Sequence, residues 1–254
     1  MRKLSVSILS ALALVVPAAA SAADLPVKAA RPMVSAPAFS WTGCYLGAGG
    51  GYGMWNQENT AFDPITGAVV SRGATTGGRG WFGTGQVGCD YQFATNWVLG
   101  AFADYNFGSL KGDLGTLTGA GVAIVGSEKM TSKWAAGGRL GYVVLPNLLG
   151  FVSGGWTEAH FNQVNFTTAA GSAVVDTMRS RNQSGWFLGS GYEYGLSWLP
   201  GLFWKTEYRF SELGSNRNTL FTVGGVTAGA LNSKLYEQEV RTELVWRFSS
   251  AAWR

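Results

Sequence analysis

Histidine is nearly absent from this sequence, in which His160 is the only one among 254 residues. Nucleophilic catalysis by a Ser–His pair and histidine-based metal sites both need an imidazole, so neither is well supported. A lipid-modifying enzyme that combines His160 with Glu158 and a nearby serine is the catalytic alternative. A solvated loop histidine is the simpler interpretation, and we expect no catalytic activity, no cofactor and no metal.

Charged residues are also scarce, at 13% of the chain, whereas glycine is abundant, with 37 residues. This composition excludes a disordered chain and an ordinary helical enzyme. The uncharged run 140–157 is interrupted by Pro146 and four glycines, so we expect no membrane-spanning helix there. The net charge of +4 falls to +2 without Arg2 and Lys3, and the remaining charges are mixed in sign. We therefore expect no nucleic-acid partner.

The N-terminus carries an export signal. Arg2 and Lys3 form a positive n-region, residues 4–17 form an apolar h-region too short to span a bilayer, and Ala20-Ser21-Ala22 is a small-residue cleavage site. Residues 1–22 are thus predicted to be a cleaved signal peptide. Residues 23–40 are rich in alanine and proline and are predicted to form a periplasmic N-terminal segment.

Residues 239–248 alternate between charged and apolar side chains, which is the two-residue period of a strand with two unlike faces. A strand of a soluble sandwich gives the same pattern, but here the pattern recurs eight times behind an export signal, with aromatic residues near the segment ends. Each segment can reach the roughly 9–11 residues that a tilted strand needs to cross a bilayer. The predicted strands are 41–55, 79–93, 97–107, 130–144, 148–159, 184–196, 202–210 and 236–248.

The connections between these segments alternate in length. Three are tight (94–96, 145–147 and 197–201), and four are long and polar (about 56–78, 108–129, 160–183 and 211–235). Such asymmetry is typical of an outer-membrane barrel, in which closure leaves no unpaired strand edge in lipid. We predict an all-β, eight-stranded antiparallel up-and-down transmembrane β-barrel over 41–248, with short periplasmic turns, four long extracellular loops and a short C-terminal extension, 249–254.

The two faces of the predicted strands differ in character. The apolar face would contact lipid and carry an aromatic girdle. The predicted girdle residues are Trp41, Tyr91, Trp97, Trp134, Tyr142, Trp186, Tyr194, Trp204, Tyr208, Trp246 and Phe248. The opposite face would line a narrow lumen, where a desolvated charge needs a partner. The predicted lumen charge network is Asp104, Arg139, Glu193, Lys205, Glu207, Arg209, Arg241 and Glu243, and the same face carries Gln86, Asp90 and Asn106. Glu193 and Glu207 could act as acid and base, but ion pairing explains them more simply.

Five motifs follow one another along the chain: Trp-Thr-Gly-Cys-Tyr-Leu-Gly from Trp41, Gly-Gln-Val-Gly-Cys-Asp-Tyr-Gln from Gly85, Gly-Arg-Leu-Gly-Tyr from Gly138, Ser-Gly-Trp-Phe-Leu-Gly-Ser-Gly-Tyr-Glu-Tyr from Ser184, and Lys-Thr-Glu-Tyr-Arg-Phe from Lys205. Together they resemble the small outer-membrane β-barrel proteins of alphaproteobacteria, a family that includes major surface antigens and porin-like proteins. The resemblance implies eight strands, an outer-membrane location, and roles in envelope integrity and surface contact. Some members are described as porins and some as haem binders.

The chain departs from this family at two places. Such barrels usually end on an aromatic residue that the insertion machinery reads, whereas here Phe248 is followed by six further residues. In addition, Cys44 and Cys89 stand where relatives commonly carry aromatics. Both cysteines lie at a similar distance from the first long loop, so a cross-strand disulfide is sterically possible in the oxidising periplasm. The alternative is two unpaired small residues that face lipid.

The predicted function is a structural and surface-interaction barrel whose lumen is largely plugged by ion pairs, because about eight strands enclose a space that side chains can fill. The alternative is a small porin-like channel for ions or small solutes. Haem binding at the surface loops and lipid-modifying activity are weaker alternatives. The expected partners are outer-membrane lipid and lipopolysaccharide, the barrel-assembly machinery, and host or environmental surface ligands.

Overall fold

The computed structural model describes residues 40–63, 65–117, 123–168, 171 and 173–249. The predicted signal peptide, the predicted periplasmic segment up to residue 39, and the predicted extension after residue 249 lie outside the described residues. Within them the secondary structure consists of strands, and no helix is long and apolar enough to cross a membrane.

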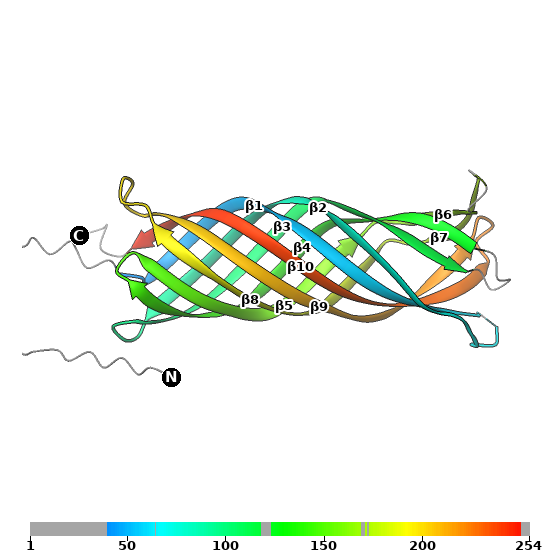
Figure 1. Cartoon of the computed structure of the whole chain (residues 1–254), viewed down its shortest axis with the longest axis horizontal. Helices are drawn as coiled ribbons and strands as arrows, with labels where there is room; N and C mark the ends of the chain where they lie inside the picture. Colours follow the sequence, from blue (N-terminus) through cyan, green and yellow to red (C-terminus); the bar gives the residue numbers. More distant parts are fainter. Residues whose placement is uncertain (1–39, 64, 118–122, 169–170, 172, 250–254) are drawn as a thin grey trace, which may run out of the picture. The chain divides into compact units, whose positions relative to one another are not determined.

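Ten strands are formed by the described residues (Figure 1). They are β1 (Gly43–Phe62), β2 (Val69–Gln92), β3 (Trp97–Leu117), β4 (Ala123–Leu145), β5 (Leu148–Phe161), β6 (Val164–Thr168), β7 (Val174–Met178), β8 (Arg181–Gly195), β9 (Leu202–Thr222) and β10 (Thr227–Ser249).

Eight of these strands close into a ring. β1 to β5, β8, β9 and β10 each pair antiparallel with the next ring strand along the chain, and β10 pairs back with β1 from Gly43 opposite Ser249 to Phe62 opposite Ala230. The predicted all-β, antiparallel, up-and-down fold is therefore confirmed. Every predicted segment overlaps one ring strand, and the three tight connections lie at one end of the barrel (Figure 1).

The predicted long loops require correction, because much of their length is strand. β1 continues to Phe62 and β2 begins at Val69, so only a short turn remains of the predicted loop 56–78. The predicted loop 160–183 contains a hairpin, β6 and β7, which pairs with β4 and β9 (Figure 1). In this part of β1, Gln57 and Asn59 point inward and Glu58 outward, so the regular alternation of a membrane strand, with its apolar outer face, is missing. Ladder pairing still satisfies the backbone.

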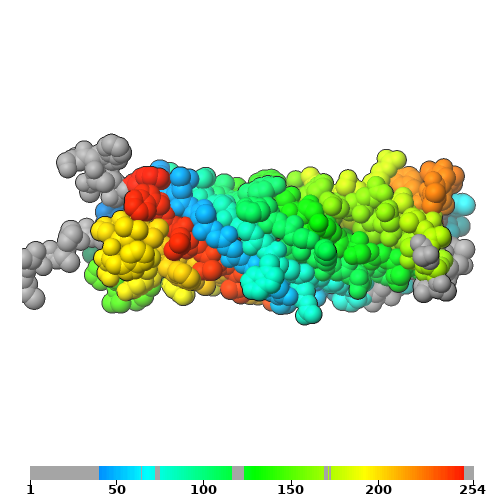
Figure 2. Space-filling view, turned by 90° about the horizontal axis from the view of Figure 1, so that it is seen from above, coloured from blue at the N-terminus to red at the C-terminus, as the bar shows by residue number. Residues whose placement is uncertain are grey.

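The strands are strongly staggered around the ring. Following directly paired residues once around it from Leu46 leads back to β1 at Asn56, ten residues further along. This stagger requires the strands to tilt by roughly 40° against the barrel axis. Figure 2 shows the tilt on one face, where β1 and β10 run as adjacent oblique bands, blue and red.

The interior holds three apolar clusters, each buried and each containing one residue of β1. Their order along the barrel follows from these residues: Tyr45, then Trp55, then Ala61. The first also contains Trp41, Val98, Phe102, Ala135, Leu149, Phe187, Phe203 and Val245; the second Phe82, Leu110, Met130, Ala159, Phe161, Leu213 and Leu235; the third Leu114, Ile124, Val164, Phe166, Met178, Leu220 and Leu231. Side chains thus fill the barrel at three heights.

Candidate functional site

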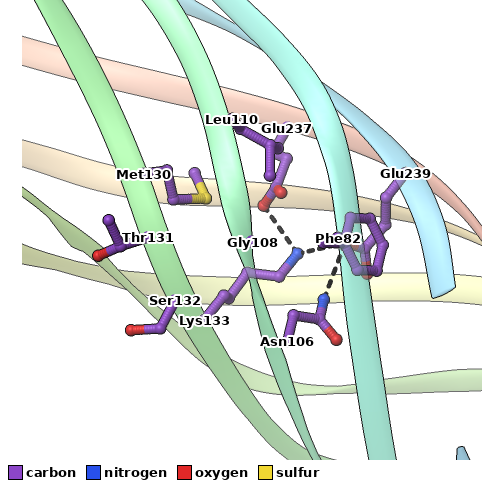
Figure 3. A pocket seen from close by; sticks show the side chains of 10 residues that line it. All are labelled: Phe82, Asn106, Gly108, Leu110, Met130, Thr131, Ser132, Lys133, Glu237 and Glu239. Atoms are coloured by element: carbon purple, nitrogen blue, oxygen red, sulfur yellow. Dashed lines mark hydrogen bonds and ion pairs between the residues drawn. The ribbon is translucent and has the colours of Figure 1, made fainter. Parts of the chain in front are cut away.

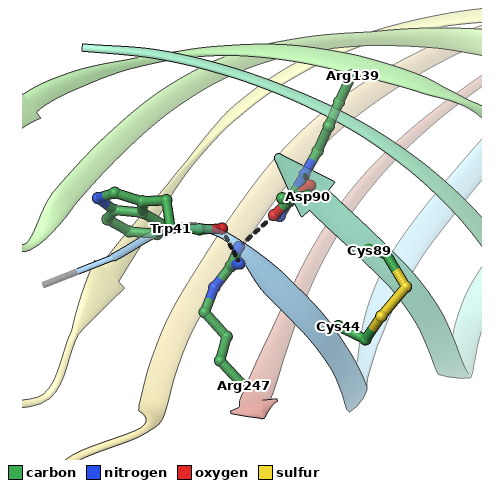
Figure 4. The surroundings of a disulfide bond; sticks show 6 residues. All are labelled: Trp41, Cys44, Cys89, Asp90, Arg139 and Arg247. Carbon is green, nitrogen blue, oxygen red and sulfur yellow. Dashed lines mark hydrogen bonds and ion pairs between the residues drawn. A yellow bond between two sulfur atoms is a disulfide. The ribbon is translucent and has the colours of Figure 1, made fainter. Parts of the chain in front are cut away.

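Buried charges occupy the lumen beside the first apolar cluster, where two arginines share two carboxylates. Arg139 donates from Nε to Asp90 at 2.9 Å, pairs with the same carboxylate through a terminal nitrogen, and reaches Glu193 at 3.1 Å. Arg247 contacts Asp90 at 2.7 Å and Glu193 at 2.6 Å. Figure 4 shows the two guanidinium groups approaching Asp90 from two sides. We call these four residues the Arg139 quartet.

A second group of ion pairs is centred on Asp104. Arg209 contacts this carboxylate at 3.0 Å and Arg241 contacts it at 3.1 Å. Both arginines also approach Glu207, at 3.2 and 3.4 Å. Because Asp104 and Glu207 come from different strands, β3 and β9, the pairs join opposite parts of the ring across the lumen.

Lys205 and Lys133 extend this group in both directions along the barrel. Lys205 pairs with Glu207 and Glu243, each at 3.1 Å. Lys133 pairs with Glu237 at 2.8 Å and Glu239 at 2.7 Å. We call Asp104, Lys133, Lys205, Glu207, Arg209, Glu237, Glu239, Arg241 and Glu243 the central network.

A small cavity adjoins the ammonium group of Lys133 (Figure 3). Its volume is about 10 Å³, and Phe82, Asn106 and Met130 are among the residues that line it. A cavity of this size holds about one water molecule. It lies where the register between β3 and β4 shifts after Phe107, which interrupts the ladder locally.

The eight predicted lumen charges are all buried and all take part in ion pairs, six in the central network and two in the Arg139 quartet. The predicted network left out five further charges, although Asp90 was assigned to the same inward face; they are Asp90, Lys133, Glu237, Glu239 and Arg247. Each of them lies at an inward-facing position of its strand, so the alternation of the sequence could have identified them. Together the two groups contain six cations and seven carboxylates, none more than 5% exposed. Since unpaired buried charges are costly, this mutual pairing is what allows the lumen to hold them.

The outer wall carries the cysteines. Cys44 and Cys89 are directly paired residues of β1 and β2, and their Sγ atoms are 2.05 Å apart in a disulfide (Figure 4). This bond links the first two strands near the end of the barrel that has the tight turns. The structure therefore contradicts the alternative of two unpaired cysteines.

Aromatic side chains form two rings on the outer wall, and ten of the eleven predicted girdle residues are 41–63% exposed there. The turn-side aromatic ring comprises Tyr91, Trp97, Tyr142, Tyr194, Trp204, Trp246 and Phe248. We call the part of the barrel beyond the other ring, where the strands continue toward the β6–β7 hairpin, the extension. The extension-side aromatic ring comprises Trp81, Tyr105, Phe107, Trp134, Trp156, Trp186 and Tyr208. Eight residues separate the rings on β4 and on β8, which is about 20 Å across the membrane for a tilted strand. Such spacing suits the apolar band of a small barrel.

Trp41 was predicted in the girdle, and that prediction is wrong, because this side chain is fully buried. Gly43 has a φ of +149°, a backbone conformation that favours glycine, and the chain before β1 turns into the barrel mouth. There the Trp41 ring packs 5.1 Å from the ring of Phe203, and its carbonyl accepts a hydrogen bond from Arg247. The indole therefore closes the lumen instead of contacting lipid.

His160 lies at the outer wall near the end of β5. Its Nδ1 atom is 2.6 Å from the amide oxygen of Asn182, whose amide nitrogen donates to Glu158 at 3.0 Å. The hydrogen-bond partner of the imidazole is thus an amide, and the arrangement of nucleophilic catalysis is not formed by these residues. Among the described residues, no group of three or more His, Cys, Asp or Glu side chains could hold a metal ion.

Beyond the extension-side aromatic ring, Glu128 and Arg181 form a buried ion pair inside the barrel. Burial raises the pKa of the Glu128 carboxyl, and the nearby Arg181 guanidinium opposes this effect only in part.

No protein-family model matches the chain. The 31 kDa outer-membrane immunogenic proteins of Brucella melitensis biotype 1 and Brucella suis biovar 1 are each 28% identical to it over 249 residues, which cover 95% of this chain and 98% of each relative. Among solved structures, the outer membrane protein OprG of Pseudomonas aeruginosa is similar with a TM-score of 0.50 at 10% identity, covering 82% of this chain and 97% of OprG.

These similarities confirm the predicted resemblance to small outer-membrane β-barrel proteins and the predicted location. The chain is an outer-membrane β-barrel protein that is similar to surface antigens.

Proposed function

We propose that the protein contributes to envelope integrity and surface contact as a barrel filled by its own side chains, and that it does not act as an open pore. The observation that carries this proposal is the filling of the lumen. Three apolar clusters, the Arg139 quartet and the central network occupy it together, with charged and apolar side chains at the same heights. The cavity beside Lys133 has room for only about one water molecule.

The surface role is supported by the part of the barrel beyond the extension-side aromatic ring. β3 continues for ten residues after Phe107, which corresponds to roughly 25 Å along the axis. Its turns expose apolar side chains, with Ile65 at 92%, Val223 at 70% and Val226 at 67%. We propose that this extension faces the outside of the cell and supplies the contacts.

Planar-bilayer conductance of the refolded protein tests the plugged lumen. Wild type should give only small or rare conductance events. Arg139→Ala should give larger ones, because it removes a side chain that fills the lumen and leaves Asp90 and Glu193 with one guanidinium between them. Lys234→Ala is the matched control, since this lysine forms an exposed pair with Glu212 and should leave conductance unchanged.

Large and stable channels in the wild type would contradict the proposal and favour the small porin-like channel instead. Identical conductance of wild type and Arg139→Ala would show that the quartet does not limit ion flow.

A further inference from the structure

Three cations stand in a row on the outer wall. Arg79 of β2 is directly paired with Lys111 of β3, which is directly paired with Lys129 of β4. All three belong to the outward face; Arg79 and Lys111 are exposed and Lys129 is half-buried. None of them forms an ion pair with another described residue, whereas Arg181 and Lys234 at a similar height pair with Glu128 and Glu212.

The row is unfavourable for the barrel by itself. Like charges directly opposite each other on neighbouring strands repel and destabilise a sheet. At the β1 end the row meets Met54, and at the β5 end it meets the backbone of Asn162, so neither end is neutralised. Glu128, next to Lys129 in sequence, faces inward and pairs with Arg181. On the outward face Asp113 lies two residues beyond Lys111, directly opposite Gly77 and Ser127, and forms no ion pair with the three cations. A separate anion would relieve the repulsion.

The height of the row identifies the chemistry of that anion. Arg79 lies two residues outward from Trp81, Lys111 four residues outward from Phe107, and Lys129 five residues outward from Trp134. The row therefore begins next to the extension-side aromatic ring and reaches about 12 Å beyond it. Interfacial aromatic residues mark the headgroup level of a bilayer, and basic clusters at that level attract anionic lipid headgroups. Three cations on adjacent strands span about 10 Å, which suits a headgroup with more than one phosphate.

We propose that Arg79, Lys111 and Lys129 form a binding site for the phosphate groups of lipopolysaccharide in the outer leaflet. The Arg79 guanidinium supplies a planar fork that matches phosphate oxygens, and the two lysines supply point charges. The site rests on the proposed outward orientation of the extension. A phospholipid headgroup with one phosphate would leave part of the row uncompensated.

The test measures binding of purified lipopolysaccharide to the full-length protein in phosphatidylcholine nanodiscs. Arg79→Gln/Lys111→Gln/Lys129→Gln should weaken affinity on the order of 100-fold, because each basic residue near a membrane surface contributes to anionic lipid binding. The matched control is Arg179→Gln/Arg217→Gln/Lys234→Gln, which removes the same charge from scattered positions and should bind as wild type does. Retained heat-modifiable mobility on detergent gels verifies that each variant is folded.

A second arm needs no variant: wild-type protein should lose a similar share of its affinity for the same lipopolysaccharide after enzymatic dephosphorylation. The site is ruled out if the triple variant or the dephosphorylated lipid binds as tightly as wild type with intact lipid. Equal affinity for phosphatidylglycerol would overturn the choice of lipopolysaccharide. Because binding is measured without conductance, an open pore would refute the plugged barrel and leave this result interpretable.

Discussion

At the scale of single residues, the Arg139 quartet shows how the lumen tolerates charge. Two guanidinium groups contact the same two carboxylates, so each carboxylate has two cationic partners. Glycine makes room for such groups: a Cβ atom on Gly189 would lie 2.7 Å from a carboxylate oxygen of Glu207 and 2.5 Å from Ser153 Oγ. The backbone and the charged side chains are therefore in direct contact, and we expect substitutions at either to lower the stability of the barrel.

Arg139→Ala should destabilise the barrel by about 3–5 kcal/mol, which is typical when one partner of a buried ion pair is removed. Urea unfolding of the refolded protein measures this. Adding Glu193→Gln to Arg139→Ala should recover part of the loss, because the surplus carboxylate is then neutral. Strictly additive losses in the two variants would argue against direct coupling.

Because Cys44 and Cys89 form a disulfide, we expect a thiol-alkylating reagent to label neither cysteine in unfolded, unreduced protein from the envelope. Both cysteines should be labelled after reduction. Cys44→Ser/Cys89→Ser should still fold, and its loss of stability should stay below the roughly 4 kcal/mol that chain entropy gives for an otherwise free loop of this length. The sheet already holds the two strands together. Two free thiols before reduction would contradict the bond.

Glu128 should titrate above 4.5, the ordinary value for glutamate, because burial raises its pKa. The sign follows from linkage: the cost of the ionised carboxylate is present above the folded pKa, and stability increases as the pH falls through that value toward 4.5. Carbon-13 NMR of the carboxyl group measures the midpoint, and Glu128→Gln assigns the resonance. A midpoint at or below 4.5 would contradict a pKa of Glu128 that is raised by burial.

At the scale of strands and turns, the two ends of the barrel differ. One end has the tight connections, including the turn with Gly201 at a φ of +89°, and the other has the extended strands and the β6–β7 hairpin. The two aromatic rings lie closer to the tight turns, so the membrane band includes only part of each long strand. This asymmetry is the basis for placing the extension outside the cell.

An epitope inserted between Gly224 and Gly225, in the turn between β9 and β10, should be labelled by antibody on intact cells. The matched insertion, in the turn at 197–200 between β8 and β9, should be labelled only after the outer membrane is permeabilised. Both sites are turns with exposed side chains, Val223 and Trp198 among them, so tolerance should be similar. The reverse labelling pattern would invert the proposed orientation.

At the scale of the whole barrel, ring closure makes unfolding cooperative, since the pairing of β10 with β1 ties the last strand to the first. We expect unheated samples to migrate differently from boiled samples on detergent gels. An Arg247→Ala/Trp41→Ala variant, which removes the contacts at the barrel mouth, should lose its folded band at a lower temperature than wild type. A single band that does not depend on heating would contradict a closed barrel.

The sequence alone determined the compartment, the fold class and the face of each membrane strand. The reason is physical: in lipid, a strand must alternate between an apolar outer face and an inner face, and that period is local and readable, as in 239–248. The same period placed Asp104, Arg139 and Glu207 inside. Strand parity also pointed inward for Lys133 and Arg247, which the prediction omitted.

Only the tertiary structure decided the rest. Which charges pair depends on the stagger of the ring, because the ten-residue offset sets which residues of different strands lie at the same height. The same offset separates the Arg139 quartet from the central network. Trp41 precedes the first strand, so no periodic pattern could tell that its ring turns inward. The extension lacks the apolar outer face of a membrane strand and resembles a loop in sequence, and its strands are fixed by ladder pairing and by the third apolar cluster, whose members come from strands far apart along the chain. The alignment of Arg79, Lys111 and Lys129 likewise exists only once the register of three strands is set.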